Sequence, residues 1–364
     1  RDDFKEKQAP QVVPYLQQAD IRYCMVEQLL SDRGSLQVFA GWNFRVPPRC
    51  VDTYKISGID VGSPNGNHAL EFGHDAFLDT IDILEKNGVR VIGAGRNIAE
   101  ARKPAIIERK GLKVAFLAYT SILGPGEAAE ANRPGVAPMR VDTHYRLNEY
   151  NQPGTPPVIR SIPWREDLEA MKADVKKAKQ ESDIVIVAFH FGIHYIRALL
   201  AEYQFEAAHA AIDAGADLIV GHHPHILKGI EVYNGKVIFY SLGEFMHDRL
   251  LKLPGGDTFV QKAMKEATGG NIGITGGQKP ATAHGRMIDV NRTGLGKIIV
   301  LNKKIERVSF VPWKMSADEH PTPQKMAPGS ESFNEVVNYM QDITQEAGLN
   351  TQFKLEGDEL VIVT

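Results

Sequence analysis

The residues that could do chemistry include three histidines within four positions: His222, His223 and His225, separated only by Pro224. They follow the apolar run at residues 218–220, which is typical of a buried strand. Neutral imidazole is a common ligand for Zn, Mn or Fe, and it can act as an acid or a base near neutral pH. The cluster therefore predicts a metal site or an acid–base site at the end of a strand, where open α/β sheets bind ligands.

Two further polar clusters follow short apolar runs. His190 is the first polar residue after the run at residues 184–189, and His194 follows four positions later as a candidate catalytic residue. Asn67 and His68 come after a strand-like segment at residues 59–62. A lone histidine at a strand end is more often structural than catalytic, but three clusters at comparable positions favour one shared site. We expect His190, His223 and His225 to converge there.

Glu244 is a further candidate catalytic residue. It follows the apolar segment "VIFYS", which a short link joins to the histidine-bearing strand. We expect the two strands to pair as a hairpin that brings Glu244 close to the histidines. Beside a metal or an imidazolium, a glutamate can ligate the metal, orient a histidine or act as a general base. The alternative is a solvent-facing turn residue.

Composition limits the partners and the compartment. The chain has 364 residues, with 42 Lys and Arg against 45 Asp and Glu, so no basic excess indicates a nucleic-acid partner. No apolar run is long enough to span a membrane, and no signal peptide is visible. The two cysteines, Cys24 and Cys50, are too few for a disulfide framework, which favours a reducing, cytoplasmic location.

Apolar strands alternate with amphipathic helices along the chain, which predicts the α/β fold class. The predicted helices are residues 75–88, 168–182 and 204–215. The predicted strands are residues 89–93, 113–119, 183–189, 216–220, 237–241 and 297–300.

We interpret residues 1–364 as one domain with two insertions and an extension. The first insertion, at about residues 123–165, is rich in proline near its end, and we expect it to cover part of the molecule. The second, at about residues 249–296, is rich in glycine and is typical of a mobile lid or a disordered loop. The extension, at about residues 330–364, predicts a capped helix and a final strand.

Four segments together resemble the CapA family, named for a poly-γ-glutamate capsule biosynthesis protein. They include "GNHALEFGHDAFLDTIDILEKNGVRVIGAGRN", "KVAFLAYTSI", "DIVIVAFHFGIHY" and "LIVGHHPHILKGIEVYNGKVIFYSLGEF", and the resemblance extends from about Ala19 to Asp248. It implies a metallophosphoesterase-like fold, which is a four-layer α/β/β/α sandwich.

The resemblance also implies roles for individual residues. Its histidine-containing motifs match Asn67-His68, His190-Phe191-Gly192 and Gly221–His225, and its N-terminal acidic element matches the segment "YCMVEQ". His68 would be the acid that protonates a leaving group. The implied ligands of one or two divalent ions of Mn, Zn or Fe are Glu27, Asn67, His190, His223 and His225.

The chain departs from the family pattern at several positions. Met25 stands where asparagine is usual, Glu71 replaces the usual aspartate, and Glu244 replaces a common asparagine. The Gly-Asp element that usually opens the family pattern is not in the sequence, and its aspartate would be the first metal ligand. Some relatives are epimerases thought to work without a metal, so the resemblance leaves the metal open.

Three classes of function remain open on the sequence alone. A metal held by the histidines would activate water for hydrolysis of an amide, such as a γ-glutamyl or peptide bond, or of a phosphoester. Without a metal, the imidazoles with Glu27 or Glu244 would form an acid–base pair for epimerisation or elimination. The third class is a non-catalytic accessory protein of polymer biosynthesis. We expect a CapA-like hydrolase of capsule and poly-γ-glutamate biosynthesis.

Arg96 and Arg102 are the candidate substrate-binding residues. Both lie in the segment "GAGRNIAEARKP", and either guanidinium could pair with a carboxylate or phosphate of a small-molecule or peptide substrate. The alternative is that they are surface or helix-capping residues. The sequence contains no signal for a particular substrate or oligomeric state.

Overall fold

The computed structural model describes residues 10–37, 44–152, 154–245, 289–316 and 322–364. Its central element is a six-stranded sheet with the strand order β14-β15-β13-β12-β8-β7. The strands are β7 (Ala105–Arg109), β8 (Leu112–Thr120), β12 (Ile184–His190), β13 (Leu218–His222), β14 (Ile230–Tyr233) and β15 (Lys236–Phe239). The four central strands β8, β12, β13 and β15 are parallel, so their carboxyl ends lie at one edge of the sheet.

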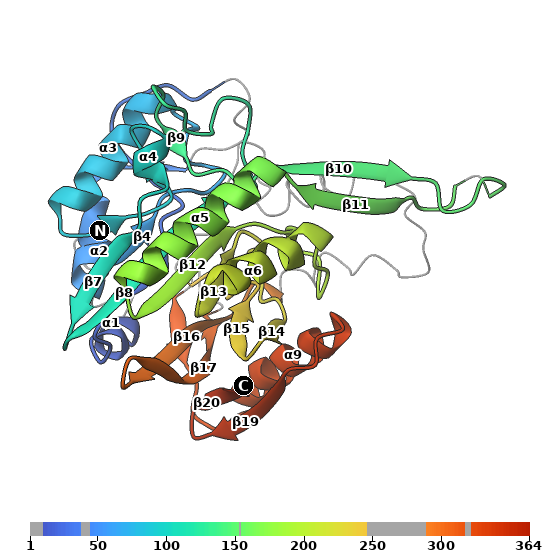
Figure 1. The fold of residues 1–364 in the computed structure, drawn as a ribbon. Coiled ribbons are helices and arrows are strands. Elements are labelled where there is room, and N and C mark those ends of the chain that lie inside the picture. Colours follow the sequence, from blue (N-terminus) through green and yellow to red (C-terminus); the bar gives the residue numbers. More distant parts are fainter. Residues whose placement is uncertain (1–9, 38–43, 153, 246–288, 317–321) are drawn as a thin grey trace, which may run out of the picture.

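Two helices cover one face of this sheet, α5 (Arg165–Glu181) and α6 (Glu202–Ala214) (Figure 1). Because side chains alternate along a strand, Val185 and Val187 of β12 face the helices and pack with Met171 and Ala207. β12 is buried along its whole length, which explains why its sequence is an unbroken apolar run.

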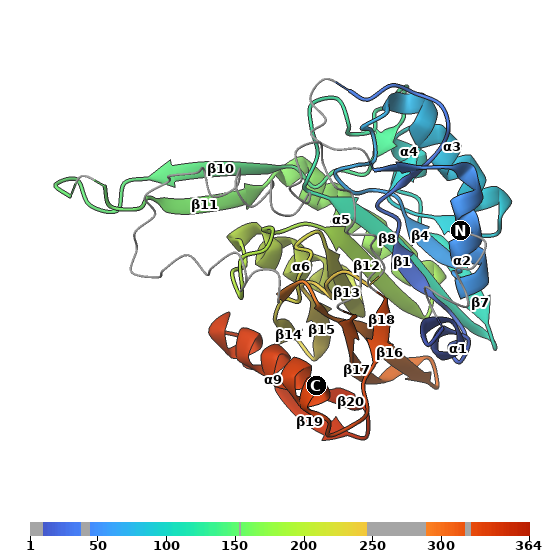
Figure 2. The same ribbon diagram turned by 180° about the vertical axis from the view of Figure 1, so that it is seen from behind.

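A second sheet covers the opposite face, as seen from behind in Figure 2. It has the order β16-β17-β20-β19, with β18 paired to β17. Its strands are β16 (Arg292–Leu301), β17 (Lys304–Met315), β18 (Pro323–Lys325), β19 (Gln352–Glu356) and β20 (Glu359–Val363). Ile186 and Val220 of the first sheet share a core with Phe310 of β17 and with Phe333 of helix α9 (Glu331–Glu346).

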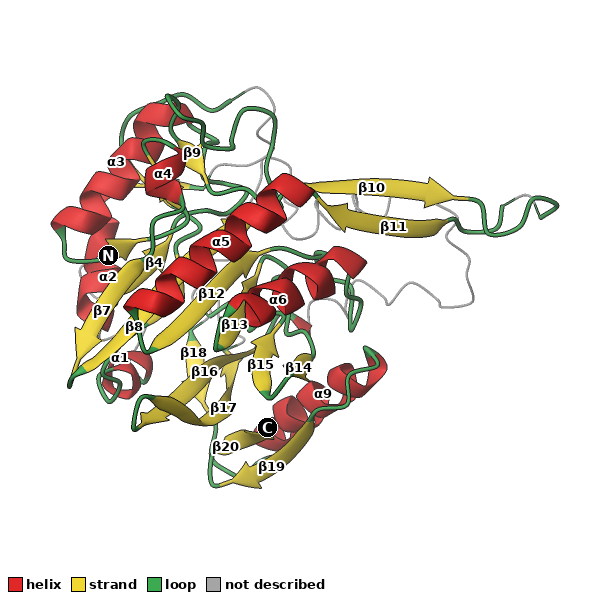
Figure 3. Ribbon diagram, in the orientation of Figure 1, coloured by secondary structure: helices red, strands yellow, loops and turns green. Residues whose placement is uncertain are grey.

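The N-terminal part of the chain builds a small parallel sheet, β1-β4-β5. Its elements and the short elements around it are α1 (Val12–Leu16), β1 (Tyr23–Met25), β2 (Leu29–Leu30), β3 (Arg45–Val46), a 3-10 turn (Pro48–Val51), α2 (Asp52–Ser57), β4 (Val61–Ser63), α3 (Gly73–Lys86), β5 (Arg90–Val91), β6 (Ala94–Gly95) and α4 (Ile98–Ala101). Figure 3 shows the resulting mixture of helices and strands, so the predicted α/β class is confirmed.

The hairpin predicted between the histidine-bearing strand and the "VIFYS" strand is wrong. β15 lies parallel to β13, and its antiparallel partner is β14. The supposed link "KGIEVYNG" contains β14, which forms the edge strand of the sheet. The chain then turns back as β15, between β14 and β13. The adjacency that the prediction needed is still present, because β13 and β15 are neighbours.

The two insertions differ from their predicted form. The first contains β9 (Gly135–Val136) and a hairpin of β10 (Val141–Arg146) and β11 (Val158–Pro163), which projects away from the body in Figures 1 and 2. Most of the second lies outside the described residues, but residues 292–296 belong to β16 and not to a loop. In the extension, Ser330 caps α9 as predicted, and β19 is a strand that the sequence reading missed.

Gly221 allows β13 to approach the chain that follows β15. A Cβ atom on this glycine would lie 2.2 Å from the carbonyl oxygen of Tyr240 and 2.7 Å from the ring of Phe191. We therefore expect Gly221→Ala to lower the free energy of unfolding by about 1–3 kcal/mol, the usual range for overpacking. Urea denaturation measures the change. Gly124→Ala is the control, because its Cβ would have no neighbour closer than 3.4 Å; equal stability of the two variants would contradict the prediction.

Candidate active site

The histidines of the site lie at the carboxyl ends of two adjacent strands. His190 ends β12 and pairs in register with His222, which ends β13. The chain then turns through His223 and His225, whose φ angles are 97° and 58°. A non-glycine residue at positive φ is strained, by about 1–3 kcal/mol where the surroundings impose the conformation. This turn directs His223 back toward His190, with the His223 Nδ1 atom 3.2 Å from the His190 Nε2 atom.

The N-terminal sheet supplies the other half of the site. Glu27 follows β1, and Asn67 and His68 follow β4, which lies parallel to β1. Gly66 permits the close approach of the two halves, because a Cβ atom there would lie 2.6 Å from Met25 Cε and 3.2 Å from His190 Cε1.

Asn67 joins the two halves through its side-chain amide. Its Oδ1 atom lies 2.8 Å from His190 Nε2, and its Nδ2 atom donates to His68 Nε2 at 3.1 Å. Three atoms that could coordinate a metal ion therefore lie close together: Asn67 Oδ1, His190 Nε2 and His223 Nδ1. The predicted convergence is confirmed for His190 and His223, and the His225 ring lies beside His223 with ring centroids 6.2 Å apart. The role of the three histidines as ligands stays a prediction.

Glu27 lies between two imidazoles, each of which contacts a second carboxylate. Its Oε1 atom is 3.9 Å from His68 Nε2 and 3.6 Å from His225 Nε2. On the far side of each ring, His68 Nδ1 bonds Glu71 at 2.5 Å and His225 Nδ1 bonds Glu244 at 2.8 Å. The predicted placement of Glu244 beside the histidine cluster is confirmed. The Oε1 atom of Glu27 is buried and has no hydrogen-bond partner among the described residues.

The loop after β12 covers the two histidines of the turn. His194 stacks on His223 with ring centroids 3.8 Å apart, and Tyr195 stacks on His225 at 5.5 Å. Lys228 anchors this loop to the core. Its side chain is fully buried and donates to the carbonyl oxygens of Ile196 and, at 3.0 Å, Leu199.

Burial keeps His190, His194 and His223 neutral. Desolvation lowers the pKa of His190 and of His223 well below the ordinary value, and the neighbouring imidazoles lower both further. The same causes lower the pKa of His194 to about 3. Neutral imidazoles keep a lone pair that can bind a metal or accept a proton.

The two arginines predicted to bind substrate are paired with carboxylates of the protein. Arg96 pairs with Asp82 and, at 3.3 Å, with Glu100. Arg102 makes a two-pronged ion pair with Asp174, at 2.6 and 2.9 Å. Arg96 is thus the surface residue that the sequence left as the alternative, whereas Arg102 links the end of α4 to α5. Substrate binding by either residue stays a prediction.

Sequence reasoning assigned no role to three residues that shape the site. Glu71 was noted only as a departure from the family, although its i, i+3 spacing from His68 is a usable signal. Tyr195 and Lys228 carry no such signal, because their contacts depend on the path of the loop. His222 belongs to a separate contact, with its Nε2 atom 3.0 Å from the hydroxyl of Tyr23.

The donor set fits a divalent ion that accepts imidazole and amide ligands. Ligands about 2.1 Å from one tetrahedral ion lie roughly 3.4 Å apart. The Asn67–His190 and His190–His223 atom pairs, at 2.8 and 3.2 Å, are close to this spacing. Within the described ranges, no three His, Cys, Asp or Glu side chains form such a group by themselves.

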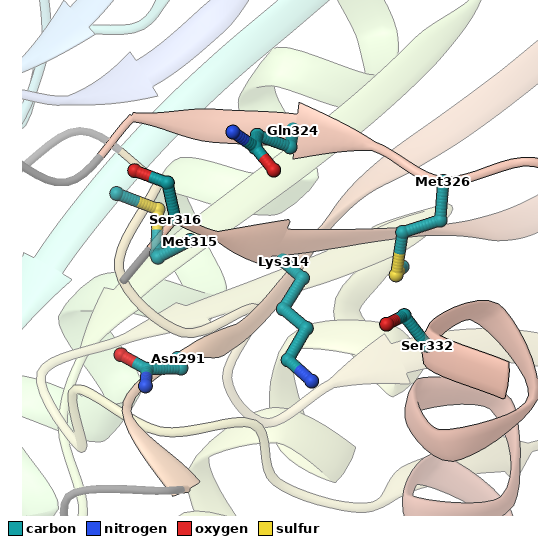
Figure 4. A pocket seen from close by; sticks show the side chains of 7 residues that line it. All are labelled: Asn291, Lys314, Met315, Ser316, Gln324, Met326 and Ser332. Atoms are coloured by element: carbon teal, nitrogen blue, oxygen red, sulfur yellow. The ribbon is translucent and has the colours of Figure 1, made fainter. Parts of the chain in front are cut away.

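A separate pocket of about 400 Å³ lies in the C-terminal part of the chain, beside β17, β18 and α9 (Figure 4). Its lining is mixed, with Met315 and Met326 beside Lys314 and several uncharged polar side chains. Lys314 is already paired with Glu335. The positive charge of Lys314 is therefore already balanced within the protein. The pocket shares no lining residue with the histidine cluster.

Comparison with known proteins identifies the family. Residues 3–249 match the model of the bacterial capsule synthesis protein family PGA_cap. The chain belongs to this family. The matched range includes every residue of the histidine and carboxylate cluster.

Several curated proteins are similar to the chain. The PGA biosynthesis protein CapA of Bacillus subtilis is 34% identical over 62% of this chain and 52% of its own length. The capsule biosynthesis protein CapA of Bacillus anthracis is 30% identical over 65% and 53%. A probable polyglutamine synthesis accessory protein of Mycobacterium tuberculosis is 31% identical over 56% and 50%. The chain thus spans about half the length of the curated relatives it matches.

Solved structures give weaker similarities. A hypothetical protein from Thermus thermophilus has a TM-score of 0.45 at 13% identity, covering 84% of this chain and 92% of that one. A calcineurin-like phosphoesterase of Bacillus subtilis has a TM-score of 0.32 at 16% identity, covering 82% and 73%. Neither score supports a conclusion about this protein. Separately, each helix in the described part of the chain is too short or too polar to cross a membrane.

We expect Lys228 to give the protein a measurable pH dependence. Desolvation lowers its pKa from 10.5 to about 7. Between these values the unfolded chain holds a proton that the folded chain lacks, so the free energy of unfolding rises with pH, by up to about 1.4 kcal/mol per unit. Lys228→Met should remove this rise.

Urea denaturation of wild type and Lys228→Met at several pH values between about 7.5 and 9 measures this rise in the free energy of unfolding. In this pH range the folded and unfolded states differ in bound protons. Lys110→Met is the control, because that side chain is exposed. Parallel pH curves for wild type and Lys228→Met would show that Lys228 is protonated in the folded state.

Proposed function

We propose that this chain is a metal-dependent hydrolase of capsule and polyglutamate biosynthesis that cleaves an amide or a phosphoester bond. The family supports the biological setting, and the names of the Bacillus relatives refer to PGA and capsule biosynthesis. The observation that carries the chemistry is the convergence of Asn67 Oδ1, His190 Nε2 and His223 Nδ1. A four-layer metallophosphoesterase-like sandwich is part of this proposal.

The ligand set of the proposal is Asn67, His190 and His223, with Glu27 and His225 completing it or holding a second ion of Mn, Zn or Fe. A bound divalent ion would polarise the scissile carbonyl or phosphoryl group and lower the pKa of water. The neutral state of His190 and His223 supports their role, because only a neutral imidazole has a lone pair to give.

His68 is the proposed acid that protonates the leaving group. Its Nδ1 atom bonds Glu71 and its Nε2 atom accepts from Asn67, so His68 must first take up a proton on Nε2, in place of the Asn67 bond, before it can give that proton to the leaving group. Nε2 faces Asn67 and Glu27, which places it beside the proposed ligands. Glu71 would fix the orientation of the ring and stabilise its protonated form.

A second candidate function uses acid–base chemistry without a metal. The observation that favours it is the position of Glu27 between His68 and His225, each held by its own carboxylate. Two such imidazoles on either side of a bound substrate could remove a proton next to a carbonyl and return it, which is the chemistry of an epimerase or a lyase.

Metal analysis and activity together separate these candidates. We expect protein purified without added metal to contain Mn, Zn or Fe, and both His190→Ala and His223→Ala to lose it. The surface variant His74→Ala should keep the metal. Hydrolysis of γ-glutamyl oligomers and of p-nitrophenyl phosphate, with and without chelator, provides the activity readout. Metal-free protein with full activity would favour the acid–base enzyme, and metal-free inactive protein would favour an accessory role.

Glu244 should contribute to turnover through His225. Its carboxylate contacts His225 Nδ1 at 2.8 Å, and glutamine cannot take up a proton or balance an imidazolium charge. Glu244→Gln should therefore reduce kcat by at least about tenfold while the fold is retained. Steady-state kinetics with a circular dichroism check measures this. Glu231→Gln, outside the cluster, is the control, and activity of Glu244→Gln within about twofold of wild type, well short of a general-base loss, would remove Glu244 from the mechanism.

A further inference from the structure

The β10–β11 hairpin forms an arm of two strands. The two strands pair with each other in register from Val141↔Pro163 to Arg146↔Val158. At the base of the arm, Ser161 and Arg160 of β11 contact Glu202 at the start of α6. Among the described residues, β10 has no strand partner on its other side. The arm extends away from the body in both ribbon views (Figures 1 and 2).

The composition of the arm is unusual for a surface that faces only water. Tyr145 is 71% exposed, Leu147 is 62% exposed and Ile159 is 56% exposed. Tyr145 and Ile159 lie directly opposite each other on one face. A two-stranded hairpin is at best marginally stable in water, and a long edge with apolar residues is a template for another strand. Both features indicate that the arm has a partner.

The charges on β10 are complementary to a second copy of β10. Asp142, His144 and Arg146 lie on one face of the strand, and Thr143 and Tyr145 lie on the other. If two copies run antiparallel with His144 at the two-fold axis, Asp142 of each copy stands opposite Arg146 of the other. The two-fold symmetric pairing thus forms two Asp142–Arg146 ion pairs, because the side chains of directly opposed residues in a sheet are close enough to interact.

Other pairings lack this complementarity. A parallel pair of β10 strands would bring like charges together, with Asp142 beside Asp142 and Arg146 beside Arg146. Pairing through β11, centred on Arg160, would oppose two arginines. The base of β11 is also in contact with α6, and Pro163 has no amide hydrogen to donate.

We propose that the chain forms a two-fold symmetric dimer in which the β10 strands of two copies pair antiparallel, centred on His144, to make a four-stranded sheet from the two arms. The partner is therefore a second copy of this chain. Since the contact is an edge rather than a broad apolar face, ion pairs make a large contribution, and the dimer weakens as the salt concentration rises.

The test is a charge exchange on the full chain. Sedimentation velocity across about 1–100 µM should show a dimer for wild type, in the range usual for modest interfaces. Arg146→Asp opposes two pairs of carboxylates, and Asp142→Arg opposes two pairs of guanidinium groups. Each single variant should weaken the dimer by at least about tenfold. The double variant Asp142→Arg/Arg146→Asp restores both pairs and should restore the dimer.

The exposed variant Lys177→Asp on α5 is the matched control for a charge reversal away from the arm, and it should dimerise like wild type. Recovery in the double variant also shows that loss in the single variants is not misfolding. A wild-type monomer at all concentrations would overturn the proposal. So would single variants that dimerise normally, or a double variant that stays monomeric, because each outcome removes the Asp142–Arg146 pairing.

Discussion

The parallel alignment of strands is the constraint on which the site depends. β8, β12, β13 and β15 end at one edge of the main sheet, and β1 and β4 end together in the N-terminal sheet. Each strand ends in a polar residue or leads into one, so pairing of the backbones alone gathers those side chains. The contact between Asn67 and His190 is where the two sheets meet at the site, and Gly66 provides the space for it.

The electrostatics of the site follow from this gathering. Strand ends packed on both sides leave little water around the imidazoles, so desolvation lowers the pKa of His190, His194 and His223. The carboxyl groups of Glu27, Glu71 and Glu244 contact the rings of His68 and His225 in the same cluster. An environment of neutral imidazoles and carboxylates attracts a cation, whether a metal ion or a proton carried by a histidine during a reaction.

The strand ends could be read from the sequence because they depend on local pattern. Apolar runs that stop at His190 or Gly221 predict both a strand and the edge at which it ends, and most of the site follows. The path of the chain between strands could not be read in this way. The segment "KGIEVYNG" was expected to be a short link between two paired strands, but it holds β14, and its Asn234-Gly235 pair, both at positive φ, forms the turn between β14 and β15. The support of His194 and Tyr195 by Lys228 depends on a loop whose conformation no periodicity specifies.

The insertion at residues 123–165 shows that one segment can serve two parts of the molecule. Its first half lies near the site, where burial raises the pKa of Glu127 and the charges of Glu71 and His68 act on it in opposite directions. Its second half leaves the body as the β10–β11 arm. The stacking contacts on His223 and His225 come instead from His194 and Tyr195, in the loop held by Lys228. Among the described residues, it is therefore the loop anchored in the core that covers these two histidines, while the arm extends away from them.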